Sequence, residues 1–380
     1  MAWHLITGEY PPQCGGVGDY TAQLAQALVE AGETVTVWCP AGIGDQNSGR
    51  VRVRAELGRM GWSDFRRMDQ LLDAEPRPRR LVVQWVPHAF GRRAVNWPFC
   101  RWVRSRARRG DELSVMIHEA FLDYSGSLKK RLAAFVQRLM MRELLAEANA
   151  AWVSTAAWLP LVRPYARPDL TVEWLPVPSN VQVFCDQETT MSLRQTLAPD
   201  GQPIVGHFGT YGGHTAELLR QSLFHLCKRR QDVTVLLLGR QGEVFRQRLV
   251  QEGIVEPRRI HAPGRLEAGP LSIHLAACDV MMQPYCGGIS TRNGSLMACL
   301  SHGRPVVASR GSLTEPEWEA WQAVELTDEH DLEAMAEAIC RLLNDPGRRQ
   351  DLAQQAQAVY EAHFSLRHTV ERLLAVPSAA

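Results

Sequence analysis

Three features that would point directly to a protein class are missing from this chain. No apolar run approaches the length needed to span a bilayer, and the net charge is only +1, which gives no general argument for binding nucleic acid. The nine cysteines include no C-x-x-C pair, which excludes the usual spacings of zinc and redox motifs. We therefore expect reduced thiols in a cytoplasmic protein, without a signal peptide before its first strand.

What the chain does have is length and apolar content. Its 380 residues exceed a usual domain, and 45% of them are hydrophobic, enough for two cores. Apolar β-rich runs alternate with helical periodicity, which predicts an α/β fold whose parallel sheets are covered on both faces. Two prolines in residues 175–181 predict a linker. We predict domains over 1–178 and 179–362, and a C-terminal helix in 363–380 that can pack back on the first domain.

The first of two glycine loops follows the opening strand. Residues 6–20 read ITGEYPPQCGGVGDY and lead into an amphipathic helix. A strand, a glycine loop and a helix N-terminus can together present backbone N–H groups to an anionic or polyhydroxylated ligand. The loop has neither the G-x-x-x-x-G-K-[ST] pattern nor the G-x-G-x-x-G spacing, and the next strand ends in Cys39-Pro40 instead of an acidic residue. A P-loop enzyme and a dehydrogenase are both disfavoured.

The second glycine loop follows a predicted strand at 280–283. Residues 285–295 read YCGGISTRNGS, and the next helix is predicted to start near Ser290 or Asn293, with Ser290 as a candidate N-cap. Free N–H groups at residues 291–295 would then form an anion site at the helix N-terminus. Such a site suits the diphosphate of a nucleotide sugar.

Both loops, together with residues 303–309 (GRPVVAS), resemble those of the retaining glycosyltransferases of the family 4 type, or glycosyl transferases group 1. The resemblance implies the GT-B fold, in which two Rossmann-like, doubly wound parallel-sheet domains face each other across a cleft. It also implies hexosyl transfer from a nucleotide sugar to an acceptor with retention of anomeric configuration. Neither a metal ion nor a cofactor is expected.

The chain departs from this family around the second loop. Aligned on Gly303, the two glutamates of the family's E-x7-E pattern fall on Ser290 and Ala298, so the usual contacts with sugar and ribose are missing. A family lysine is also missing, since residues 205–215 read VGHFGTYGGHT. We predict that Arg292, together with Arg265, supplies the charge for the diphosphate. The alternative is that Arg292 is an ordinary surface residue of the helix.

The resemblance assigns site residues to both halves. His118 and Glu119 follow a buried strand and are the predicted catalytic residues, placed to contact the transferred sugar or steer the acceptor. Their pairing is not H-E-x-x-H, so no metal is predicted. The predicted acceptor-binding residues are Gly15, Gly16, Asp19, Tyr20 and His88. The predicted donor-binding residues are Gly209, Thr210, Gly212, Gly239, Arg265, Leu266, Ser290, Thr291, Arg292, Asn293, Gly294 and Ser295.

Arginines cluster between Arg92 and Arg109, with two tryptophans among them. One interpretation is a solvated helix face. The other is a peripheral contact, either with anionic lipid of a membrane or with a phosphorylated acceptor.

The predicted partners are a nucleotide-sugar donor and a small-molecule, glycan or lipid-linked acceptor, with no nucleic acid. Two alternatives to a glycosyltransferase stay open: a GT-B relative such as an epimerase or phosphorylase, and a non-catalytic nucleotide-sugar-binding protein.

Overall fold

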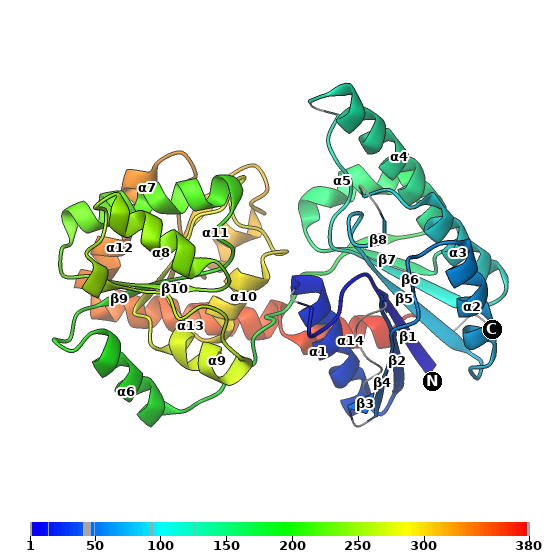
Figure 1. Cartoon of the computed structure of the whole chain (residues 1–380), viewed down its shortest axis with the longest axis horizontal. Coiled ribbons are helices and arrows are strands. Elements are labelled where there is room, and N and C mark those ends of the chain that lie inside the picture. Colours follow the sequence, from blue (N-terminus) through cyan, green and yellow to red (C-terminus); the bar gives the residue numbers. More distant parts are fainter. Residues whose placement is uncertain are drawn as a thin grey trace. The chain divides into compact units, whose positions relative to one another are not determined.

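The computed structural model describes residues 2–13, 15–40, 47–48 (backbone only), 50–91, 94–124 and 126–377. It divides into two compact units (Figure 1). Unit 1 comprises Met1–Val177 with Leu366–Ala380, and unit 2 comprises Pro178–Ser365. The division at Val177/Pro178 lies within the proline-containing segment that the sequence marks as a linker.

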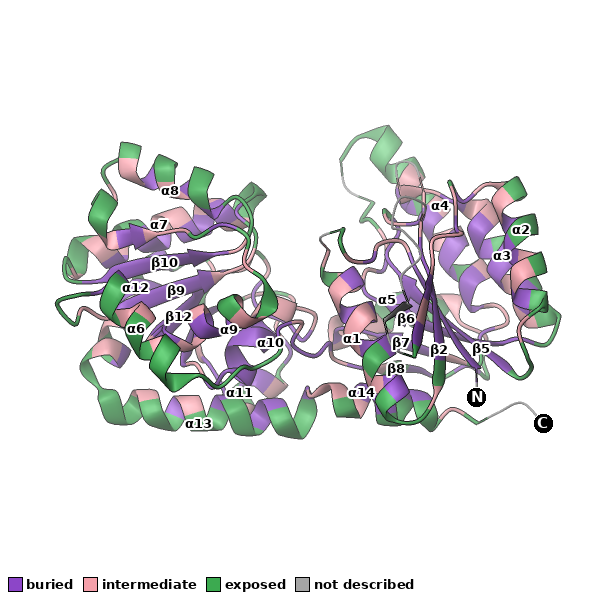
Figure 2. Ribbon diagram, turned by 60° about the horizontal axis from the view of Figure 1, so that its bottom comes forward, coloured by how far each residue is buried: buried purple, intermediate pink, exposed green. Residues whose placement is uncertain are grey.

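Unit 1 is built on a sheet of order β3-β4-β2-β1-β5-β6-β7-β8, in which only the short β3 is antiparallel to its neighbour. Helices cover the sheet, and every residue of β1, β5 and β6 is buried (Figure 2). The elements are β1 (Ala2–Thr7), α1 (Gly16–Glu30), β2 (Thr34–Trp38), β3 (Asn47–Ser48), β4 (Val51–Arg54), α2 (Trp62–Asp73), β5 (Arg79–Trp85), α3 (Trp97–Arg108), β6 (Glu112–Ile117), α4 (Leu128–Leu145), β7 (Ala150–Val153), α5 (Leu159–Val162), β8 (Val172–Trp174) and α14 (Leu366–Leu374).

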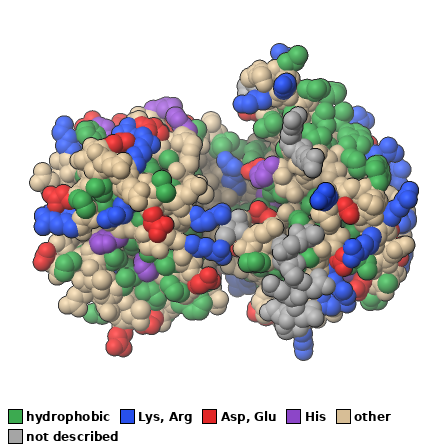
Figure 3. Space-filling model, viewed as in Figure 1, with side chains coloured by type: hydrophobic (Ala, Val, Ile, Leu, Met, Phe, Trp, Pro, Cys, Tyr) green, Lys and Arg blue, Asp and Glu red, His purple; other side chains and the backbone are tan. Residues whose placement is uncertain are grey.

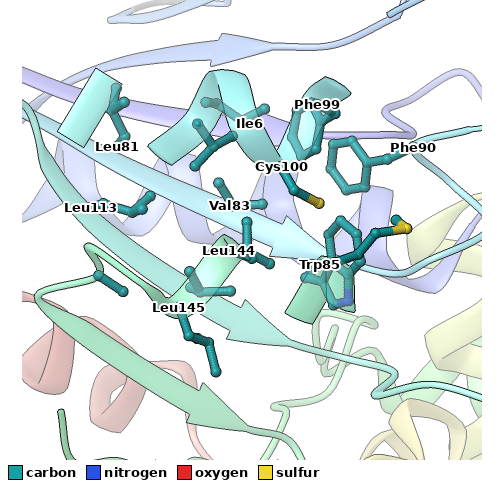
Figure 4. Packing of buried hydrophobic residues seen from close by; sticks show 14 of the residues in the cluster. Ile6, Leu81, Val83, Trp85, Phe90, Phe99, Cys100, Leu113, Leu144 and Leu145 are labelled. Atoms are coloured by element: carbon teal, nitrogen blue, oxygen red, sulfur yellow. The ribbon is translucent and has the colours of Figure 1, made fainter. Parts of the chain in front are cut away.

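An aromatic stack fills the core between β5 and α3 (Figure 4). The ring of Phe90 lies 4.4 Å from that of Phe99 and 5.6 Å from that of Trp85, and all three side chains are fully buried. Burial of such large rings contributes several kcal/mol of hydrophobic stabilisation. The stack packs against the carboxyl end of β5, where the following loop begins.

Unit 2 is a six-stranded parallel sheet of order β11-β10-β9-β12-β13-β14. Val205, Val235 and Leu237 of its central strands pack against helices α7 and α12. The elements are α6 (Gln187–Leu197), β9 (Ile204–Phe208), α7 (Gly213–Arg229), β10 (Thr234–Leu238), α8 (Gly242–Gln251), β11 (Ile260–His261), α9 (Ala268–Ala276), β12 (Val280–Gln283), α10 (Gly294–Ser301), β13 (Val306–Arg310), α11 (Glu317–Trp321), β14 (Glu325–Asp328), α12 (Leu332–Asn344) and α13 (Pro346–His363).

The last helix, α14, belongs to unit 1, where it packs against α1. Its residues Thr369, Val370 and Leu373 are buried, and the side chain of Arg80 donates a 3.0 Å hydrogen bond to the carbonyl of Val376 just beyond it. No helix in the described part of the chain is both long enough and apolar enough to cross a membrane.

Strand order locates the ligand edge of each unit. In a doubly wound sheet, ligands bind at the carboxyl ends of the strands, where the order reverses. The reversal falls between β1 and β5 in unit 1, and between β9 and β12 in unit 2. The glycine loops of the sequence follow β1 and β12, so both lie at these switch points.

Candidate functional site

In unit 1, the glycine loop after β1 is occupied by a carboxylate of the chain itself. One oxygen of Glu9, Oε1, accepts hydrogen bonds of 3.0 Å from the backbone N–H groups of Val17 and Gly18 in the first turn of α1. Gly15 makes room for it, because a Cβ there would lie 2.1 Å from both Glu9 oxygens. Because these two N–H groups are already bonded to a carboxylate, the loop suits a hydroxyl-bearing ligand better than an anion.

His118 follows β6 and is buried beside the end of β5. Its Nε2–H donates a 2.7 Å hydrogen bond to Oε1 of Gln84, and the ring of Tyr20 lies edge-on 4.9 Å away. Burial lowers the pKa of His118 to about 3, so the imidazole is neutral at physiological pH. A neutral ring that donates through Nε2 keeps a lone pair on Nδ1, which makes His118 an acceptor for a hydroxyl and a poor base.

The remaining residues predicted to bind the acceptor lie around the same edge. His88 and Glu119 form a 3.1 Å pair, and both side chains are exposed. Tyr20 is buried, and burial raises the pKa of its hydroxyl, which also interacts with Thr369 of α14. Gly16 and Asp19 lie in the first turn of α1. The strand order thus gathers the residues that the sequence assigns to this half.

In unit 2, the glycine loop after β12 is held by neighbouring segments. Tyr285 N–H donates to Oγ of Ser309 at 2.7 Å, and Thr291 donates to Glu315 through both its N–H and its hydroxyl. Glu315 also accepts a 2.9 Å hydrogen bond from the indole N–H of Trp318. This buried carboxylate fixes the loop from inside the unit, which corrects the expectation that Thr291 offers a free N–H group.

The helix that follows begins at the later of its two predicted start points. Its N-cap is Asn293 instead of Ser290, because Asn293 Oδ1 turns back to accept from Ser290 N–H at 2.7 Å. Both Ser290 and Thr291 are completely buried. Ala298, at the second glutamate position of the family, is also completely buried inside α10.

The first turn of α10 stays open. Within the described chain, the N–H groups of Gly294 and Ser295 have no hydrogen-bond acceptor, and no side chain caps the helix. The hydroxyls of Ser295 and Tyr285 lie 2.5 Å apart beside these N–H groups, and Arg292 and Asn293 are half-buried next to them. An open helix N-terminus with adjacent hydroxyls and a guanidinium can bind a phosphate group.

The other predicted donor residues lie on loops at the same sheet edge. Gly209, Thr210 and Gly212 follow β9, and Gly239 follows β10 with φ +118°, a conformation that favours glycine. A Cβ at Gly239 would lie 2.2 Å from the Gly209 carbonyl, so the two loops meet closely here. Arg265 and Leu266 follow β11, where Arg265 is exposed and Leu266 half-buried.

Sequence reasoning missed two residues of these sites, Glu9 and His207, and did not foresee which groups Glu315 contacts. Glu9 and Glu315 are acids whose role depends on the backbone N–H groups that they meet in space, although each lies close to a glycine loop in sequence or in the fold. His207, at the end of β9, is buried and donates through Nδ1 to the carbonyl of Met282 at 2.9 Å. Burial lowers its pKa to about 4, so it too is neutral.

The described residues contain no cluster of three His, Cys, Asp or Glu side chains that could hold a metal ion.

The arginines of the 92–109 region are mostly ion-paired. Arg106 is fully buried between Asp73 and Asp111, and Arg104 lies 3.0 Å from Glu143. Arg108 and Arg109 pair with Glu147 and Asp69 in the same way, while Arg92 and Arg93 lie outside the described residues.

Known protein families match both units. The glycosyl transferase 4-like domain matches residues 15–178, and glycosyl transferases group 1 matches residues 202–345. The chain therefore belongs to the group 1 glycosyltransferases and is a glycosyltransferase of the GT-B type. No curated protein sequence matches the chain.

Solved structures agree with this fold over nearly the whole length. Sucrose-phosphate synthase from Thermosynechococcus elongatus is 18% identical with a TM-score of 0.74, covering 98% of this chain and 97% of its own. Anabaena Alr3699/HepE, in complex with UDP-glucose, is 15% identical with a TM-score of 0.69, covering 98% and 99%. A trehalose-phosphate synthase (UDP-forming) from Burkholderia xenovorans, in complex with glucose-6-phosphate, is 13% identical with a TM-score of 0.68, covering 98% and 99%.

Proposed function

We propose that this chain transfers a hexosyl group from a nucleotide-sugar donor to a hydroxyl of its acceptor, with retention and without a metal ion. The observation that supports this most is the open first turn of α10 beside Arg292, Ser295 and Tyr285. The acceptor belongs to the class of small molecules, glycans or lipid-linked compounds.

The donor's leaving group sets the main electrostatic demand. As the glycosidic bond to the nucleoside diphosphate breaks, negative charge grows on its terminal phosphate. The N–H groups of Gly294 and Ser295 and the guanidinium of Arg292 can stabilise that charge. Because they are fixed before reaction, little reorganisation is needed when the bond breaks. Retention then follows from attack on the same face of the sugar, assisted by the departing phosphate.

In unit 1, the uncharged side chains of His118 and Gln84 support the acceptor part of the proposal. The lone pair on Nδ1 of His118 can accept a hydrogen bond from a sugar or acceptor hydroxyl, while Gln84 fixes the ring through Nε2. With its pKa at about 3, His118 positions a hydroxyl instead of removing its proton. Glu119, paired with His88 at the exposed rim, is the available carboxylate for steering the acceptor.

The test is donor binding by the Arg292→Ala variant. Calorimetry with a panel of nucleoside diphosphates and nucleotide sugars should give one selective ligand for the unaltered chain. Loss of a charge-assisted phosphate contact should weaken that ligand at least tenfold, roughly, in Arg292→Ala. Arg258→Ala is the matched control, because Arg258 is exposed, pairs with Glu256 and precedes β11 at the opposite end of the strand.

Unchanged affinity in Arg292→Ala would remove the proposed phosphate contact. Slow release of nucleoside diphosphate from the bound sugar nucleotide separates a working transferase from a binding protein. Binding without any hydrolysis or transfer would favour the non-catalytic alternative.

A further inference from the structure

The first half of α4 presents large apolar side chains outward. Leu128, Leu132 and Phe135 are 82%, 63% and 48% exposed, and their spacing places them on one face of the helix. The opposite face, including Ala134 and Met140, is buried on unit 1 (Figure 2). Exposed leucine and phenylalanine side chains in a contiguous stripe mark an interaction surface more often than isolated ones do.

The segment before the helix extends this apolar surface and is firmly attached to it. Leu122 and Tyr124 are 45% and 49% exposed. Gln137 accepts a 2.8 Å hydrogen bond from Leu122 N–H, and Arg138 donates a 2.8 Å bond to the Leu122 carbonyl. The Arg138 guanidinium also lies 4.0 Å from the ring centroid of Tyr124. We call Leu122, Tyr124, Leu128, Leu132 and Phe135 the α4 face.

The charges along α4 beside this face are positive from Lys129 to Arg142, and one exposed acid, Asp123, lies between Leu122 and Tyr124. Residues 128–142 contain five basic residues and no acidic one, namely Lys129, Lys130, Arg131, Arg138 and Arg142. All except Arg138 are exposed, and these four form no ion pair with any residue that the structure describes. Figure 3 shows hydrophobic side chains gathered over α4, with Lys and Arg side chains toward its free end. The arginines of α3 differ, because carboxylates neutralise most of them.

We propose that the α4 face docks unit 1 on the surface of an anionic lipid bilayer. Apolar side chains flanked by lysine and arginine are typical of helices that lie in the membrane interface, with the apolar stripe in the acyl boundary and the cations at the headgroups. A second copy of this chain fits less well, since a self-complementary contact would bring identical positive flanks together. The proposal goes beyond sugar transfer and does not depend on it.

Vesicle co-sedimentation of the full chain tests the proposal. The chain should sediment with vesicles of phosphatidylcholine and phosphatidylglycerol but not with phosphatidylcholine alone, and salt should release it. The triple variant Leu128→Ser, Leu132→Ser, Phe135→Ser should bind the anionic vesicles at least tenfold less, roughly, because its apolar contact area is removed. Lys129→Glu, Lys130→Glu, Arg131→Glu should lose at least about tenfold as well.

Two matched variants keep the test specific. Met191→Ser, Phe224→Ser, Val244→Ser removes apolar side chains of unit 2 that are 63%, 47% and 67% exposed, and should bind like the unaltered chain. Arg66→Glu, Lys228→Glu, Arg348→Glu makes the same change in net charge at exposed sites on α2, α7 and α13, and should keep most of the binding. Unchanged thermal midpoints show that each variant is folded.

Three results would overturn the proposal. The first is equal sedimentation with neutral and anionic vesicles, or none with either. The second is undiminished binding by a folded α4 variant. The third is a dimer in solution that the apolar α4 variant dissociates while no vesicle binding is seen, which would make the α4 face a contact between copies.

Discussion

The two glycine loops look alike in sequence, yet the structure uses them differently. Each lies at the switch point of a parallel sheet, and each has a glutamate of the chain bonded to backbone N–H groups. Glu9 binds within the first turn of α1, which closes that helix N-terminus. Glu315 binds Thr291, three residues before α10 begins, and so braces the loop while the first turn stays open.

This difference gives a physical reason for the two roles that the family resemblance assigns to the loops. An open helix N-terminus with an adjacent guanidinium suits a phosphate, whereas a helix already capped by a carboxylate repels one. The comparison therefore supports a donor on unit 2 and a hydroxyl acceptor on unit 1. In unit 1 the Glu9 carboxylate occupies the N-terminus of α1. In unit 2 the Glu315 carboxylate holds the loop in place and leaves the N-terminus of α10 open.

Removal of the Glu315 carboxylate should have the largest effect. In Glu315→Ala, the N–H and hydroxyl of Thr291 and the indole N–H of Trp318 lose a buried acceptor, which should cost unit 2 about 3 kcal/mol. Hydrogen exchange of unit 2 peptides measures this loss. Glu319→Ala is the control, since its side chain is 62% exposed and should matter by less than about 0.5 kcal/mol. Equal protection in both variants would show that Glu315 does not hold the loop.

Displacement of Glu9 should have the next largest effect. A Cβ in Gly15→Ala would overlap the Glu9 carboxylate, which should uncap α1 and cost unit 1 about 1–2 kcal/mol. Gly16→Ala is a neighbouring control, because no atom lies within 4 Å of a Cβ at that position. Hydrogen exchange of α1 peptides distinguishes them. If the two substitutions cost the same, the capping by Glu9 is not what stabilises the helix start.

Acidification compares the strand-end histidines, and just below neutral pH its effect should be the smallest of the three. The folded pKa of His118 is about 3, below its unfolded value, so the unfolded state takes up a proton first as pH falls through about 6.5. Stability should therefore be constant above that pH and fall below it, by at most about 1.4 kcal/mol per pH unit for this residue.

The slope of unfolding free energy against pH, measured by urea denaturation between about pH 5 and 6.5, should decrease in His118→Asn. His207→Asn gives the corresponding measurement in unit 2, where burial also keeps the histidine neutral. An unaltered slope in His118→Asn would mean that His118 is protonated as readily in the folded chain as in the unfolded one.

Local pattern predicted the architecture well for physical reasons. Buried parallel strands are continuously apolar and helices are periodic, so the alternation and the proline-containing break at 175–181 could be recognised without the fold. The group 1 motifs at residues 303–309 likewise indicated the family that the matched domains show. The sequence left the α10 start open between Ser290 and Asn293, because both are good N-cap residues and only their mutual hydrogen bond decides between them.

The sequence by itself determined the α/β class, the two glycine loops and the family. Only the tertiary structure decided which N–H groups stay open, which arginines are neutralised and which helix face is left uncovered. The reason is that charge pairing and burial depend on distant residues, such as Glu315 beside Thr291 and Asp111 beside Arg106. Local pattern fixes where a helix begins and which residues recur on its face, but the groups that meet it are brought there by the fold.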